Sequence, residues 1–124
     1  MNKEDKELLL KDLCARLPYG VKIQVPYEDG SGYFDETVWE VNNEGPFHVN
    51  GWGIEYEYVK PYLFPLSSMT EEQKKEYQYI TERWMYDSSY SISDSTDWLN
   101  KNHFDYRGLI KKGLAIDATG LDIY

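Results

Sequence analysis

Cysteine, histidine and long hydrophobic runs are scarce in this 124-residue chain. The single cysteine, Cys14, excludes a disulfide within the chain, which is typical of a reducing compartment. No segment reaches the ~18 apolar residues that a membrane-spanning helix needs. The leucine run near the N-terminus is short and flanked by charges, unlike a secretion signal. We therefore expect a cytoplasmic protein without a membrane span.

Motifs for catalysis and ligand binding are also missing. The two histidines, His48 and His103, do not complete a four-ligand zinc site with one cysteine unless carboxylates contribute. The GSG at 30–32 lacks the lysine and the strand–helix context of a phosphate loop, and no serine lies in a nucleophile elbow. We expect no metal, no cofactor and no enzymatic activity.

Positive charge is the third deficit, with 13 basic and 22 acidic residues and a net charge of −9. Residues 19–60 hold only two basic residues against eight acidic ones. Such a surface repels phosphate backbones, so direct nucleic-acid binding is not expected. A basic protein partner fits this charge. The alternative is an acidic mimic of nucleic acid that occupies a DNA-binding protein.

Aromatic residues are plentiful, with 12 tyrosines and 4 tryptophans. A hydrophobic content of 41% is too high for a disordered chain, and the length predicts one domain over residues 1–124. Tyrosine combines an apolar body with a polar tip. The rings therefore suit either a small core that reaches the surface or an aromatic recognition surface.

The N-terminal segment predicts an amphipathic helix over 3–17. Asn2 is its expected N-cap, and Pro18 ends it because the residue before a proline avoids helical geometry. Four residues at helical spacing form the expected apolar face: Leu10, Leu13, Cys14 and Leu17. This places Cys14 in the core as an inert thiol.

Residues 19–66 predict four or five short strands separated by tight turns. The clearest runs are 21–25, 33–41, 46–50 and 53–59, with EDGSG, NNEG and NGWG between them. Run 33–41 breaks its alternation, which indicates either a bulge near Glu36 or burial of both faces. This segment predicts a small SH3-like β-barrel, with a curled antiparallel meander as the alternative.

The C-terminal half predicts helices, which makes the fold class α+β. An extended connector at 61–69 leads to a helix that starts at a capping box, either Thr70 with Gln73 or Ser68 with Glu71. A second helix over 95–103 directs Trp98 and Leu99 inward. A docking turn at 109–110 ends at Gly113, and the tail, 114–124, either packs or frays.

Three blocks of the chain read RLPYGVK, KPYLFPLSSMTEEQKK and WLNKNHFDYRGLIKKGLA. They resemble segments of a family of small proteins from gut anaerobic bacteria and their phages. Members of that family are similar at the start and at the end and vary in the middle. The resemblance implies a cytoplasmic protein from a phage-linked gene. It brings no activity and no site residue with it.

The candidate binding residues lie in the strand-rich segment. A tryptophan at the tip of an Asn-Gly hairpin is hard to bury locally, and the glutamates of run 53–59 share one strand face. We expect a partner protein to contact an acidic, aromatic surface made of Trp39, Trp52, Glu55, Tyr56 and Glu57. A small hydrolase that uses Glu55 and Glu57 as acid and base is the alternative.

Arg107 lies in a locally basic segment of this acidic chain. Between residues 101 and 113, four basic side chains face a single acidic one, Asp105. We expect Arg107 to form a structural ion pair with a carboxylate of residues 19–60, either in its own chain or in a second copy. A homo-oligomer is therefore one possible arrangement.

Overall fold

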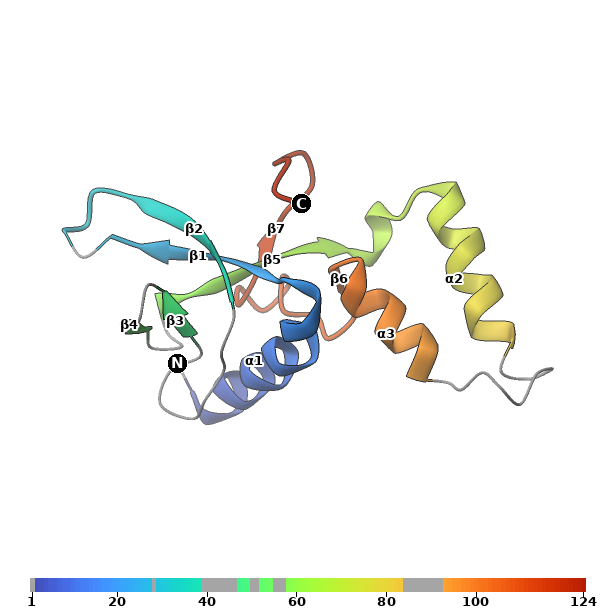
Figure 1. Ribbon diagram of the computed structural model, residues 1–124, viewed down its shortest axis with the longest axis horizontal. Helices are drawn as coiled ribbons and strands as arrows, with labels where there is room; N and C mark the ends of the chain where they lie inside the picture. Colours follow the sequence, from blue (N-terminus) through green and yellow to red (C-terminus); the bar gives the residue numbers. More distant parts are fainter. Residues whose placement is uncertain (1, 28, 39–46, 50–51, 55–57, 84–92) are drawn as a thin grey trace.

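The computed structural model describes residues 2–27, 29–38, 47–49, 52–54, 58–83 and 93–124 (Figure 1). Its class is α+β, as predicted, with an N-terminal helix and two later helices. The helices are α1 (Lys3–Arg16), α2 (Glu71–Arg83) and α3 (Ser93–Lys101). The strands are β1 (Lys22–Pro26), β2 (Tyr33–Thr37), β3 (Phe47–Val49), β4 (Trp52–Ile54), β5 (Lys60–Pro65), β6 (Phe104–Asp105) and β7 (Ile116–Asp117).

Helix α1 begins at the predicted cap, where the Asp5 amide donates to Asn2 Oδ1 at 2.7 Å. Its buried face is rotated from the predicted one and consists of Leu9, Asp12, Leu13 and Arg16. The expected burial of Cys14 is wrong, because this thiol is exposed. Asp12 and Arg16 lie on the buried face of α1 instead, and their burial is possible because the two side chains form an ion pair.

The main sheet is mixed and open. Strand order is β2-β1-β5-β6, with β7 also paired to β5. The β1–β2 and β1–β5 pairs are antiparallel, whereas β6 and β7 run parallel to β5. The predicted SH3-like barrel is not confirmed, because the sheet is not closed. The strands of residues 22–65 in this sheet pair antiparallel, whereas β6 and β7 were not predicted as strands. These strands arrive after two helices, which allows a parallel return.

The predicted connector at 61–69 instead begins with strand β5, Lys60–Pro65, which contains two prolines. Successive residues of a strand direct their backbone groups to opposite edges. The Phe64 amide donates to the His103 carbonyl on the β6 edge of β5. The Leu63 carbonyl accepts from the Ala118 amide on the opposite edge, next to β7. Pro61 and Pro65 therefore direct their nitrogens to the β7 edge, which needs few donors, so both are tolerated in a central strand.

Tyr124 fills the gap between β1 and β6 along the other edge of β5. The β1–β5 register makes Lys22 the next partner of Tyr62. Between them lies the Tyr124 hydroxyl, which accepts from the Lys22 amide and donates to the Tyr62 carbonyl, both at 2.8 Å. The tail therefore packs, and its hydroxyl stands in for a ladder hydrogen bond.

Strand β2 shows no bulge at Glu36. Its register with β1 runs without interruption from Tyr33 to Thr37, and the Val38 amide continues it by donating to the Val21 carbonyl at 2.9 Å. On either side of the predicted NGWG turn, β3 and β4 form an antiparallel ladder that ends at the pair Val49 and Trp52, as a hairpin there requires; residues 50–51 themselves lie outside the described residues.

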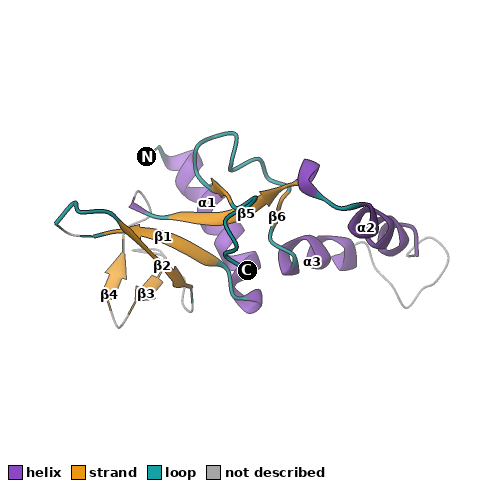
Figure 2. Cartoon of the chain, turned by 90° about the horizontal axis from the view of Figure 1, so that it is seen from above, coloured by secondary structure: helices purple, strands orange, loops and turns teal. Residues whose placement is uncertain are grey.

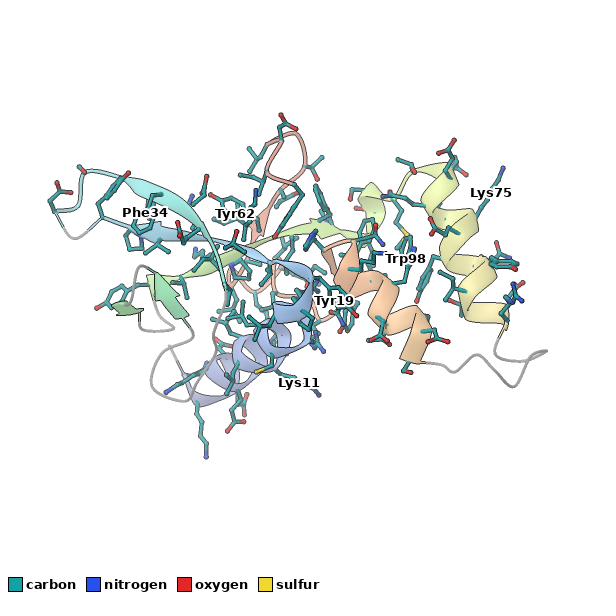
Figure 3. All side chains as sticks on the ribbon, in the orientation of Figure 1. Lys11, Tyr19, Phe34, Tyr62, Lys75 and Trp98 are labelled. Carbon is teal, nitrogen blue, oxygen red and sulfur yellow. The ribbon has the colours of Figure 1, made fainter. Side chains whose placement is uncertain are left out.

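The core has two parts along an elongated molecule. Helix α1 covers one face of the sheet (Figures 1 and 2), where Leu9 and Leu13 pack against Ile23 and Leu63. At the other end a second cluster consists of Trp98 and Leu99 from α3 together with Phe104, and residues of α2 pack against it. Trp98, labelled in Figure 3, stacks on Phe104 at 5.7 Å, which confirms its predicted inward position.

Candidate functional site

The predicted partner-binding surface falls mostly outside the described residues. Trp39, Glu55, Tyr56 and Glu57 all lie there, and only the backbone of Trp52 is described, at the start of β4. Their grouping into one surface stays a prediction. The described residues offer a different candidate site, on the β1–β2 hairpin.

The β1–β2 hairpin forms one margin of the molecule (Figure 2). Within the described part of the chain, β2 pairs with β1 alone and is an edge strand. Tyr33, Asp35 and Thr37 are exposed, whereas Phe34 and Glu36 are half-buried. Phe34 points toward the core and packs against it. The strand itself lies within the predicted run 33–41, but the residues YFDET do not alternate between apolar and polar types, so the sequence did not show which face is exposed.

The turn of this hairpin is ordered by its own polar groups. The Tyr27 amide donates to the Gly32 carbonyl at 2.9 Å, and Gly30 has a φ of +73°, which favours glycine. The Ser31 amide donates to Asp29 Oδ1 at 2.9 Å. Hydrogen bonds from Ser31 hold the pKa of Asp29 below its usual value. The turn therefore carries a negative charge at neutral pH.

A short hydrogen-bond row ties the exposed face of β2 to the centre of the sheet. The Tyr62 hydroxyl donates to Asp35 Oδ1 and accepts from Gln24 Nε2 at 3.2 Å. Burial, and then the bond to Asp35, raises the pKa of Tyr62. Figure 3 labels Tyr62 beside the β1–β2 ribbon. The row fixes the Asp35 carboxylate on an otherwise open face.

Exposed tyrosines surround this end of the sheet. Tyr33 is 64% exposed, and Tyr27 is 48% exposed while its ring tilts against Phe34 at 5.2 Å between centroids. Tyr58, which precedes β5, is 56% exposed. We use the name hairpin surface for five of the exposed residues of the hairpin: Tyr27, Asp29, Tyr33, Asp35 and Thr37. It combines aromatic rings, carboxylates and a strand edge.

Arg107 forms an ion pair, but its partner differs from the predicted one. Its Nη1 donates to Asp12 Oδ1 at 2.9 Å, so the carboxylate comes from α1 and not from residues 19–60. Asp12 is fully buried and the Arg107 side chain is 14% exposed. Sequence reasoning missed Asp12 because a lone aspartate on a helix is normally expected to face solvent.

The same carboxylate binds a second guanidinium. Arg16 Nε donates to Asp12 Oδ2 at 2.9 Å, and Arg16 Nη2 donates to the Phe104 carbonyl at 2.5 Å. The Tyr106 ring lies 4.4 Å from the guanidinium carbon of Arg107 and 5.4 Å from that of Arg16. The i, i+4 spacing of Asp12 and Arg16 was the available signal. This cluster joins α1 to the C-terminal segment and is structural.

The segment HFDYRGLI acts as the junction of the fold. Both carboxylate oxygens of Asp105 accept backbone amides, from Leu109 at 3.0 Å and from Ile110 at 2.9 Å. Leu109 is fully buried, as the predicted docking turn requires, and Gly113 follows with a φ of +77°. The residues that carry the family resemblance at this end are thus explained by packing and capping.

His103 is the most perturbed titratable group of the junction. It is 9% exposed and has a φ of +62°. Its Nδ1 has no hydrogen-bond partner within the described part of the chain. Burial, and then the charges of Arg16 and Lys22, lower the pKa of His103 to about 4. The ring is therefore neutral at pH 7.

Two features are absent from the part of the chain that the structure describes. That part contains no group of three or more His, Cys, Asp or Glu side chains placed to hold a metal ion. Nor does any described helix have both the length and the apolar character that crossing a membrane requires.

Comparison of the chain with protein-family models, with curated proteins and with solved structures finds no match. The resemblance to the phage-linked family therefore stays a prediction, and the interpretation of the site depends on its geometry.

Proposed function

We propose that this protein is a non-enzymatic protein-interaction module and that the hairpin surface is its binding site. The supporting observation is the exposed edge strand β2, which carries Tyr33 and Asp35 at the margin of the main sheet. Aromatic residues are enriched at protein interfaces because they contribute large contact areas with few rotatable bonds. Interaction sites on strands are also better fixed than sites on loops.

Charge selects the class of partner. The hairpin, residues 22–37, contains four acidic residues and a single basic one, Lys22, whose ammonium group donates to the Ile123 carbonyl at 2.7 Å. A basic protein surface complements it and is steered toward it, whereas nucleic acid is repelled. The cytoplasmic location and the phage-linked origin predicted from the sequence belong to this proposal.

The two alternative functions gain less support. A nucleic-acid mimic needs carboxylates in one row, but Asp35 and Glu36 point to opposite faces of β2 because successive strand residues alternate. A hydrolase would depend on Glu55 and Glu57, which lie outside the described residues.

Affinity capture from the native cell, with mass-spectrometric identification, tests the proposal. Wild type, Tyr33→Ser and Tyr79→Ser are compared, since Tyr79 is 57% exposed on α2 and is a matched control. We expect one basic protein to be recovered by wild type and Tyr79→Ser and lost with Tyr33→Ser. Recovery equal to that of the tag alone overturns the module. Equal recovery by all three proteins overturns the choice of surface.

A further inference from the structure

The backbone of β2 has an identifiable outward-facing set of hydrogen-bonding groups. Two bonds mark the β1–β2 ladder: the Tyr27 amide to the Gly32 carbonyl, and the Val38 amide to the Val21 carbonyl, both at 2.9 Å. In an antiparallel pair, bonded and non-bonded positions alternate. Phe34 and Glu36 therefore bond toward β1.

The other three residues of β2, Tyr33, Asp35 and Thr37, therefore direct their amides and carbonyls away from β1. No described strand pairs with them there. The edge thus presents three donors and three acceptors in a row, and the same three residues have exposed side chains. Such an edge is a template on which another strand can pair.

A second copy of this chain is a poor occupant of the edge. Pairing of β2 with another β2 brings Asp35 and Glu36 near the same residues of its partner, and like charges across strands are destabilising. Asp29 in the turn is exposed and adds a further negative charge to the repulsion. A strand with lysine or arginine has the opposite effect.

We propose that β2 accepts an extended, cationic segment of a partner protein as an added strand. This inference rests on the proposed function and specifies its partner. Main-chain bonds to Tyr33, Asp35 and Thr37 supply the register. Alternate side chains of the segment then lie beside Tyr33 and Asp35, where a basic side chain meets a carboxylate.

Synthetic peptides test the pairing on the full chain. The probe is an acetylated and amidated heptapeptide that alternates lysine and valine. One control alternates glutamate and valine, and a second carries N-methyl groups at alternate amides of the lysine peptide. Amide hydrogen exchange by NMR is the readout. We expect the lysine peptide alone to protect the amides of Tyr33, Asp35 and Thr37.

A proline variant separates strand pairing from general attraction. Thr37→Pro removes an outward amide without removing a bond of the β1–β2 ladder, whereas Thr37→Val keeps the amide. We expect the lysine peptide to bind Thr37→Pro about tenfold more weakly and Thr37→Val like wild type. The N-methylated peptide is likewise expected to bind wild type more weakly than the lysine peptide does, and this comparison needs no variant.

Three results overturn the inference: no protection of these amides by the lysine peptide, equal binding of the N-methylated peptide, or self-association of the free protein through β2. The captured partner distinguishes the two proposals. A partner that binds Thr37→Pro as tightly as Thr37→Val rejects strand addition and keeps the interaction module. Failure to capture any partner rejects the module itself.

Discussion

The imidazole of His103 lies parallel to the phenol ring of Tyr124, with 3.6 Å between centroids and 9° between planes. Burial and the nearby charges of Arg16 and Lys22 lower the pKa of His103 from 6.5 to about 4. The unfolded chain therefore binds more protons than the folded one between these values. We predict that the free energy of unfolding falls as the pH drops through this window, by about 3 kcal/mol.

Urea unfolding at several pH values from 7 to 4 measures this loss, and His103→Asn is its control. Asparagine tolerates the positive φ of this position but does not titrate. The carboxylates of the chain still make the stability of the variant sensitive to acid. The expected result is a shallower dependence of stability on pH in His103→Asn, and equal slopes in both proteins contradict it.

Removal of the Tyr124 hydroxyl is predicted to weaken the pairing of β1 with β5. Tyr124→Phe leaves the Lys22 amide and the Tyr62 carbonyl without their shared partner; because Tyr124 is 40% exposed and water can reach these groups, we expect a cost of about 0.5–1.5 kcal/mol. Tyr58→Phe, at a 56% exposed position, is expected to change little. Thermal unfolding and hydrogen exchange at the Lys22 amide are measured. An unprotected Lys22 amide already in wild type refutes the bridge.

Alkaline pH tests the same hydroxyl independently. Burial raises the pKa of Tyr124 to about 12, above the 10 of an unfolded tyrosine. Its contribution is therefore complete below pH 10 and is lost as the pH rises toward 12. Wild type is expected to lose more stability than Tyr124→Phe over this range, as measured by unfolding midpoints.

Loss of the Asp12 carboxylate is predicted to be severe. Asp12→Ala leaves two guanidinium groups, one of them fully buried, without their counter-ion, which costs about 3–5 kcal/mol. Glu7→Ala is the matched control on the same helix. Its pair with Lys3 spans 4.0 Å between exposed side chains, so a change of at most ~1 kcal/mol is expected.

Denaturant unfolding measures both variants, and Arg107→Ala completes the set. Because its partner is on α1 of the same chain, we expect Arg107→Ala to lower the melting temperature without altering the oligomeric state. If melting is unchanged, Arg107 does not secure the C-terminal segment.

The capping box of α2 permits a smaller and cleaner test. The Thr70 amide donates to Gln73 Oε1 at 2.9 Å, and the Gln73 amide donates to Thr70 Oγ1 at 3.1 Å. Thr70→Ala is predicted to destabilise the protein by about 1 kcal/mol. Thr96→Ala, at an exposed position inside α3, should be neutral or slightly stabilising in calorimetry. Equal effects of the two variants would argue against the cap.

Local chemistry explains what the sequence could reveal. A side chain that caps a helix acts over three residues, so Asn2 and Thr70 were both identifiable in advance. The alternation of Val21, Ile23 and Val25 likewise indicated one buried strand face, which the structure confirms.

Distant partners explain what it could not reveal. The buried face of α1 depends on Asp12, whose second guanidinium lies 95 residues away on Arg107. The β2 edge became a candidate site only once the strand order placed it at the margin of the sheet. The predicted site around Trp52 lies where no side chain is described, so it stays a prediction.

The parallel partners of β5 have a kinetic consequence. Phe64 pairs with a residue 40 positions later, and Tyr62 with one 54 positions later. Ribosomes add about 5–20 residues per second, so this central strand waits roughly 3–10 s for its last neighbour. Throughout that interval the edge of β5 that later pairs with β7 lacks its partner strand. Non-local closure of this kind also slows refolding from denaturant relative to a helical bundle of similar size.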